Sequence, residues 1–140
     1  MFSVIRHAGY HLGTGSLTPV GSTDSETLAK ALVAAYPAWR EIRTSSVART
    51  RETSQVLSKI LSIPVETDER IGMDGDIGDL LPPTEPHDII FVTHLPVITK
   101  MLRAWSTSFG IDEPALTEIA SGYLIDPSAR TITTINRRSS

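Results

Sequence analysis

The sequence predicts an α/β three-layer sandwich in which a mostly parallel central sheet is flanked by helices. Short runs rich in β-branched and aromatic residues alternate with longer segments of helical period. The strongest runs are almost continuously apolar, as expected for strands that are covered on both faces. Each early strand is followed by a helix, the pattern that builds a parallel sheet. With 140 residues, we expect one domain over residues 1–136 and a polar tail over residues 137–140.

The first strand is predicted at Phe2–Arg6, which is short and almost entirely apolar. A glycine-containing loop follows, and Thr18 with Pro19 marks the start of a helix. Thr23 and Glu26 have the spacing of a capping box. Leucines then recur at helical spacing until Pro37 ends the pattern.

Glu41–Ser45 is predicted as a second strand and Ile63–Thr67 as a third. Between them, Val47–Leu61 has the pattern of an amphipathic helix. The residues expected on its buried face are Val56, Leu57, Ile60 and Leu61.

From Asp68 to Pro86 the apolar pattern gives way to Gly, Asp and Pro, which predicts a loop with one helical turn near Leu80 and Leu81. Loops of this length in a compact domain are usually functional. Asp88–Thr93 is the strongest strand of the chain.

His94 follows this strand at once, and Pro96 begins the next helix. Leu116–Ile125 and Thr131–Ile135 are predicted as two final strands. We expect them to form a hairpin-like pair that turns at Asp126 and Pro127.

Composition and charge exclude several functional classes. Thirteen Lys and Arg against sixteen Asp and Glu give a net charge of −3, whereas nucleic-acid binding requires a basic surface. The absence of cysteine rules out disulfides, thiolate metal sites and thiol nucleophiles. No stretch approaches the length of a membrane helix and no secretory signal is evident, so we expect a cytoplasmic protein without nucleic-acid or membrane partners.

The polar residues at the strand ends predict an anion site. In open parallel sheets, ligands bind beyond the carboxyl ends of the strands. The first strand ends in Arg6 and His7, the second leads into a helix with Arg49 in its first turn, and the fourth ends at His94. Arginine matches phosphate oxygens bidentately, helix N-termini favour anions, and a neutral histidine can attack phosphorus. No carboxylate cluster suited to magnesium accompanies these residues, so a mechanism without metal or cofactor is the simpler interpretation.

The glycines after the first strand have a rival interpretation as a nucleotide-binding loop. Gly13-Thr14-Gly15-Ser16 lacks the lysine of a P-loop, and the residues after it break a dinucleotide-binding fingerprint. This stretch is therefore predicted to be an ordinary loop. His11 lies within it and is expected to be a loop residue, because Gly9 argues against a helical metal pair with His7.

The ordered motifs of the chain resemble those of the histidine phosphatase (phosphoglycerate mutase-like) superfamily. Arg6-His7-Ala8 resembles its Arg-His-Gly, and Leu17-Thr18-Pro19-Val20-Gly21 resembles its Leu-Thr-x-x-Gly. The stretch from Ser45 to Thr53 resembles the second motif of the superfamily, Ser-Pro-x-x-Arg-x-x-x-Thr. Thr93-His94-Leu95-Pro96 resembles a variant of the third motif, Gly-His-Asn-x-Pro. The resemblance covers essentially the whole chain and implies a phosphoglycerate mutase-like fold.

The resemblance also implies roles for residues. His7 would be the nucleophile that forms a phosphohistidine intermediate, while Arg6, Arg49 and His94 would bind and polarise the phosphoryl group. The short chain looks most like the small SixA-type branch, whose members are phosphohistidine phosphatases acting on phosphorelay proteins. The implied partner is therefore a phosphorylated substrate, including a protein that carries phosphohistidine.

The chain departs from the family pattern in three places. Ala8 stands where glycine is usual, and Ser46 where proline is common. The glutamate that larger branches use as general acid is absent, which leaves Asp74 and Asp76 as candidate acids. A phosphoramidate leaves without a strong acid, since its nitrogen can be protonated from solvent, so the missing glutamate favours phosphohistidine as substrate. Hydrolysis of small phosphate monoesters and a catalytically weak phosphate-binding module remain alternatives.

Overall fold

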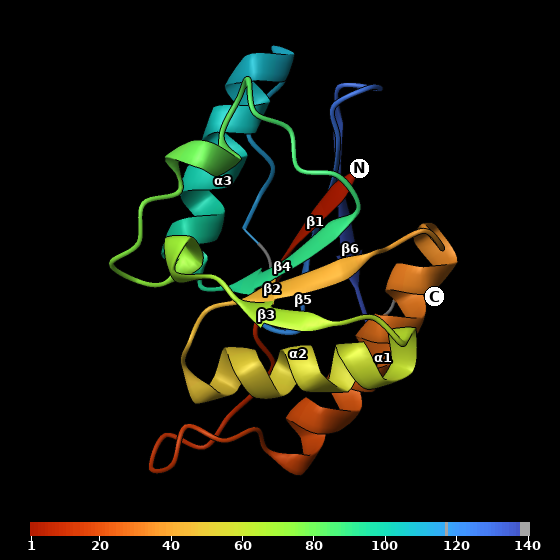
Figure 1. Ribbon diagram of the computed structural model, residues 1–140, viewed down its shortest axis with the longest axis vertical. Coiled ribbons are helices and arrows are strands. Elements are labelled where there is room, and N and C mark those ends of the chain that lie inside the picture. The colour runs from red at the N-terminus through yellow and green to blue at the C-terminus, as the bar shows by residue number, and fades with distance from the viewer. Residues whose placement is uncertain (117, 138–140) are drawn as a thin grey trace.

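Six strands form one sheet in the computed structural model, which describes residues 1–116 and 118–137 (Figure 1). The strand order is β3-β2-β4-β1-β5-β6, with parallel pairing from β3 to β1 and antiparallel pairing of β5 and β6. The strands are β1 (Phe2–Arg6), β2 (Glu41–Thr44), β3 (Val65–Thr67), β4 (Ile89–Thr93), β5 (Ser121–Asp126) and β6 (Thr131–Asn136).

Helices cover both faces of the sheet, which confirms the predicted three-layer sandwich. α1 (Pro19–Ala35) and α2 (Ala48–Leu61) pack side by side on one face, and α3 (Leu95–Phe109) lies on the other (Figure 1). Two short 3₁₀ turns, η1 (Glu69–Ile71) and η2 (Gly78–Leu80), lie on the same side as α3. The sheet separates two buried apolar clusters, and their burial is the main favourable term in folding.

The predicted elements are present with small changes at their ends. The helical turn expected near Leu80 is η2, and the terminal hairpin turns after Asp126 as predicted. Its first strand begins at Ser121 rather than at Leu116, and Thr117 within the predicted range lies outside the described residues. The third strand is shorter than predicted, covering only Val65–Thr67.

The capping box predicted from Thr23 and Glu26 is wrong. The N-cap of α1 is Thr18, whose side-chain oxygen accepts a hydrogen bond from the backbone N–H of Gly21 at 2.9 Å. The helix begins earlier than the box required because Pro19 fits its first turn, where no N–H is needed. Thr23 lies inside the helix, and its hydroxyl donates to the Pro19 carbonyl.

The buried face of α2 also differs from the prediction. Ile60 is exposed, whereas Leu57 is fully buried as expected. The buried positions of this helix are Thr50, Thr53, Ser54 and Leu57. Three of these four residues carry hydroxyl groups where aliphatic side chains were predicted. Thr53 bonds to the backbone after β1 and Thr50 to Ser45 after β2, which satisfies their hydroxyl groups inside the protein.

Arg137, the last described residue, lies near α1, with its Nε 3.6 Å from a carboxylate oxygen of Asp24. The rest of the predicted polar tail, residues 138–140, lies outside the described residues. Within the part of the chain that the structure describes, no helix combines the length and the apolar character needed to cross a membrane.

Candidate active site

The two histidines at the strand ends lie next to each other. β1 and β4 are parallel neighbours, with Arg6 paired to Thr93, so the residues that follow them emerge at the same edge of the sheet. The ring centroids of His7 and His94 are 5.8 Å apart. Both side chains are buried, with 7% of His7 and 3% of His94 exposed. The sheet topology therefore brings together the pair that the sequence predicted.

The backbone sets the tautomer of His7. Its Nδ1 lies 3.0 Å from the carbonyl oxygen of Ala8. A carbonyl oxygen only accepts hydrogen bonds, so Nδ1 carries the proton and Nε2 keeps its lone pair. The backbone N–H of His7 donates to the Thr93 carbonyl, and its carbonyl accepts from the N–H of Ala120. His7 is thereby held on both sides, and the lone pair of its Nε2 stays free of the backbone.

A chain of hydroxyl groups holds His94. Its Nε2 lies 2.8 Å from Oγ of Ser45, which in turn lies 2.7 Å from Oγ1 of Thr50. The backbone carbonyls of Ser45 and Val47 share the single proton of the Thr50 hydroxyl. Its oxygen therefore accepts from Ser45, and Ser45 accepts from Nε2–H of His94. Nδ1 of His94 is buried and has no hydrogen-bond partner among the described residues.

Burial keeps both histidines neutral. It lowers the pKa of His7, and the charges of Arg49 and Arg6 act in the same direction against the opposing bond to Ala8. Burial, Arg49 and His7 lower the pKa of His94 to about 4. At pH 7 the site therefore combines uncharged imidazoles with the permanent charges of the arginines.

Arg49 lies in the first turn of α2, and its guanidinium stacks on Tyr10. Cζ of Arg49 is 4.8 Å from the centroid of the Tyr10 ring, a geometry that favours a cation–π contact. The same ring meets His7 edge-on, with centroids 5.3 Å apart. Tyr10 therefore contacts both the predicted nucleophile and a predicted phosphate ligand. No sequence motif pointed to Tyr10, because its contacts arise only when the loop folds back.

Thr53 connects α2 to the end of β1. Its hydroxyl accepts from the backbone N–H of Ala8 at 3.0 Å and donates to the Arg49 carbonyl at 2.7 Å. Ala8 is fully buried, so a methyl group is accommodated where glycine is usual. The threonine stands in the second motif of the sequence, but its inward orientation was not foreseen.

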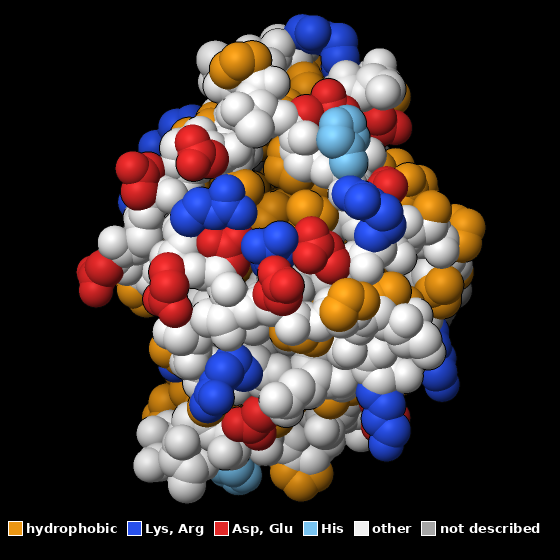
Figure 2. All heavy atoms as spheres, in the orientation of Figure 1, with side chains coloured by type: hydrophobic (Ala, Val, Ile, Leu, Met, Phe, Trp, Pro, Cys, Tyr) orange, Lys and Arg blue, Asp and Glu red, His pale blue; other side chains and the backbone are white. Residues whose placement is uncertain are grey.

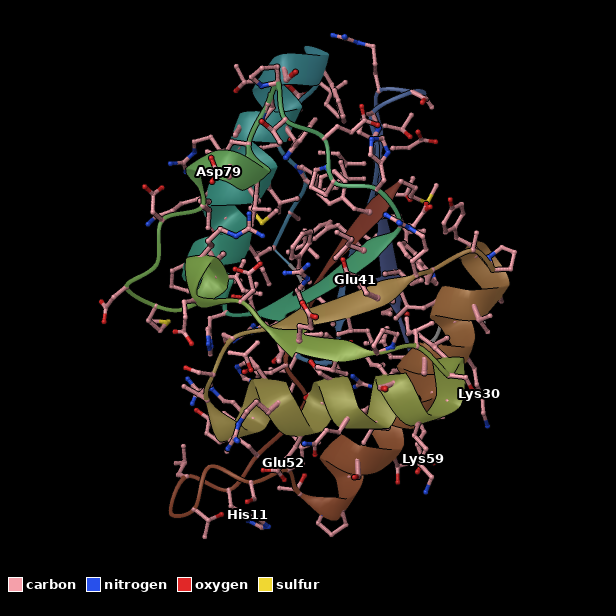
Figure 3. All side chains as sticks on the ribbon, in the orientation of Figure 1. His11, Lys30, Glu41, Glu52, Lys59 and Asp79 are labelled. Atoms are coloured by element: carbon pink, nitrogen blue, oxygen red, sulfur yellow. The ribbon has the colours of Figure 1, made fainter. Side chains whose placement is uncertain are left out.

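The loop between β1 and α1 forms a small hairpin. Tyr10 pairs with Leu17, and the backbone N–H of His11 donates to the Ser16 carbonyl. Glu52 of α2 points toward this hairpin and accepts from the N–H of Leu17 at 3.2 Å (Figure 3). The side chain of His11 is exposed on the hairpin, which confirms its assignment as a loop residue (Figure 3).

Asp74 and Asp76 line a pocket of about 510 Å³ beside His94. Ser45 also lines it, while His7, Arg6 and Arg49 do not. An oxygen of the Asp76 carboxylate accepts from the N–H of Gly78. The structure thus brings the candidate acids together with one of the two histidines. Among residues 1–116 and 118–137, no group of three or more His, Asp and Glu side chains is arranged to hold a metal ion.

Comparison with known proteins identifies the fold. No protein-family model and no curated protein sequence matches the chain. A structure of the protein histidine phosphatase SixA complexed with tungstate matches with a TM-score of 0.71 at 18% identity, over 97% of this chain and 96% of that one. The putative phosphohistidine phosphatase SixA from Agrobacterium tumefaciens matches with a TM-score of 0.68 at 17% identity, over 96% of this chain and 94% of that one. A phosphoglycerate mutase from Plasmodium falciparum matches with a TM-score of 0.63 at 14% identity, over 99% of this chain and 89% of that one. The chain therefore has the α/β fold of the phosphoglycerate mutase-like histidine phosphatases, as its sequence motifs predicted.

Proposed function

We propose that this protein is a metal-independent phosphatase that uses His7 as its nucleophile. The observation that carries the proposal is the bond between Nδ1 of His7 and the Ala8 carbonyl, which leaves the lone pair on Nε2. An imidazole that is buried, neutral and held in one tautomer is ready for attack on phosphorus at neutral pH.

The first step forms a covalent intermediate. Nε2 of His7 attacks the phosphorus, a P–N bond forms, and the bond from phosphorus to the leaving group breaks. Arg6 and Arg49 neutralise the phosphoryl oxygens. A bound phosphoryl dianion raises the pKa of His94, so that this residue takes up a proton and donates to a phosphoryl oxygen. In the second step water attacks the phosphohistidine, and inorganic phosphate and neutral His7 are released.

The leaving group must gain a proton. Asp74 and Asp76 are the candidate acids, since they line the pocket next to His94. Both side chains are exposed, so neither lies in the desolvated setting that is typical of a general-acid carboxyl group. This environment suits a phosphoramidate such as phosphohistidine, whose nitrogen can take a proton from water.

We infer that the protein is cytoplasmic and that its substrate is phosphohistidine on a protein, because two structures with the same fold are described as a protein histidine phosphatase and a phosphohistidine phosphatase. The supporting observations are the structural similarity to the SixA proteins, the sequence motifs, and the exposure of Asp74 and Asp76. Hydrolysis of a small phosphate monoester is the second candidate, because the phosphoryl site makes no distinction between P–N and P–O bonds. A phosphate-binding module with little catalysis is the third, because it would use the same arginines.

The test combines labelling with a substrate panel. Wild type should release phosphate from a phosphohistidine peptide and form an acid-labile phosphoenzyme, while His7→Ala should do neither and keep its circular dichroism spectrum. His11→Ala, which changes an exposed histidine of the same loop, is the matched control and should behave like wild type. Persisting turnover in His7→Ala would refute the nucleophile. Faster turnover of p-nitrophenyl phosphate would show that the protein is a phosphate monoesterase. Inertness toward every substrate would show that it is a phosphate-binding module.

A further inference from the structure

The pocket of about 510 Å³ next to His94 shares this one side chain with the predicted phosphoryl site. Its walls come from the turn between β2 and α2, from His94, and from residues 69–76 around η1. His94 is only 3% exposed, and its Nδ1 has no partner among the described residues. The pocket is thus continuous with a buried polar side chain of the phosphoryl site.

The walls of this pocket are acidic. Glu69, Asp74 and Asp76 line it, and within the described part of the chain none of them forms an ion pair. Figure 2 shows acidic side chains gathered over the side of the molecule where the loop with η1 and η2 lies in Figure 1.

Arg70 is the one arginine of the walls, and it is paired with Asp68. Arg70 donates from Nε and Nη2 to the two carboxylate oxygens of Asp68, at 2.9 and 2.6 Å. The Asp68 side chain is 5% exposed, and the hydrogen bond from Arg70 lowers the pKa of its carboxyl group. The charge of Arg70 is therefore matched by a buried carboxylate, and the three acids of the walls remain uncompensated.

The acidic walls are held in place by the backbone. A Cβ at Gly75 would lie 2.1 Å from the carbonyl oxygen of Glu69, so the loop packs directly on η1. Oγ1 of Thr93 donates to the Ile71 carbonyl at 2.6 Å, which fastens η1 to the end of β4. The backbone that carries the three acids is therefore fixed next to the end of β4, which His94 follows.

We propose that this acidic pocket is a subsite for the polypeptide around the phosphorylated residue and that it selects Lys or Arg beside phosphohistidine; this rests on the proposed function. The arginines bind the phosphoryl anion, while the three acids attract the cationic neighbours and repel substrates that carry a second phosphate or carboxylate. Each exposed pair contributes about two- to threefold, and a flanking Glu is repelled where a Lys is attracted, so two flanking positions together give a preference of about tenfold.

The experiment compares two phosphohistidine peptides that differ only in having Lys or Glu on both sides of the phosphorylated residue. We expect kcat/KM of wild type to be about tenfold higher for the Lys peptide at low salt, and the preference to shrink as salt screens the charges. Glu69→Lys should remove most of the preference. Asp112→Lys is the matched control, because Asp112 lies beyond the far end of α3, about 22 Å along the helix from His94, and should leave the preference intact.

Binding of non-hydrolysable phosphonate analogues of both peptides, measured by calorimetry, separates the two proposals. Tighter binding of the Lys analogue without any turnover would support the subsite and overturn the phosphatase function. Equal turnover of both peptides, or faster turnover of the Glu peptide, would overturn the subsite alone. Failure of both turnover and binding would overturn both.

Discussion

Oγ of Ser45 lies 2.8 Å from Nε2 of His94 and links this imidazole to the hydroxyl of Thr50. Because all three side chains are buried, water cannot replace a bond that is lost. The orientation of His94 is thus determined by two residues of the β2–α2 segment, which lie more than 40 positions earlier in the chain.

Removing the Ser45 hydroxyl should lower both the stability of the protein and its catalytic efficiency. Ser45→Ala leaves the Nε2–H of His94 buried without an acceptor, which costs about 1–3 kcal/mol in stability. We expect kcat/KM to fall about tenfold, since a misplaced His94 loses on the order of 1.4 kcal/mol of transition-state stabilisation. Steady-state kinetics with a phosphohistidine peptide measure this fall. Ser108→Ala, at an exposed position near the far end of α3, is the control, and an equal fall in that variant would contradict the role of Ser45.

The aromatic ring of Tyr10 should matter more than its hydroxyl. Tyr10→Leu removes the surface on which Arg49 stacks, and a cation–π contact of about 1 kcal/mol corresponds to a fivefold rise in KM. Tyr10→Phe keeps the ring and should stay within twofold of wild type. If the Phe variant lost as much as the Leu variant, the hydroxyl rather than the ring would be the functional group.

The two buried histidines should make the folded state sensitive to acid. The pKa of His94 is about 4 in the folded protein and its ordinary value is 6.5, so the unfolded chain binds more protons between these values. The stability that neutral His94 provides is complete above pH 6.5 and is lost as the pH falls toward 4. The lowered pKa of His7 acts in the same direction.

Urea denaturation at pH 7.5 and pH 4.5 measures this effect. Wild type should lose on the order of 1–3 kcal/mol across the interval through His94. His94→Gln, which keeps a polar group that reaches Ser45 but does not titrate, should lose less. An identical loss in both proteins would show that His94 is not the source.

The close approach at the start of α1 predicts a strong effect of a single methyl group. A Cβ at Gly21 would lie 2.1 Å from the carbonyl oxygen of Gly9, so Gly21→Ala must displace the backbone that follows the nucleophile. We expect destabilisation of about 1–3 kcal/mol, seen as a lower Tm, together with reduced activity. Gly13→Ala is the control, because a Cβ there meets nothing within 4 Å. A Gly21→Ala protein as stable as the control would contradict the predicted clash.

The same contact explains why the Leu-Thr-x-x-Gly pattern was readable in the sequence. Thr18 caps the helix and Gly21 allows the loop to cross it, so both are local requirements that restrict residue type. Thr23 and Glu26 have the spacing of a capping box, but the helix begins earlier. Thr18 is its N-cap, and Pro19 fixes the first turn. Spacing alone cannot rank two competing caps.

The sequence alone determined the fold class, the order of the elements and the pairing of His7 with His94 at one edge of the sheet. Hydrophobic period specifies strands and helices locally, and parallel strands place their carboxyl ends together. Tertiary structure alone decided the inward hydroxyl face of α2, the contact of Tyr10 with His7 and Arg49, and the acidic pocket beside His94. These features depend on contacts between segments distant in the chain, where a polar residue becomes buried because a partner from another element satisfies its hydrogen bonds.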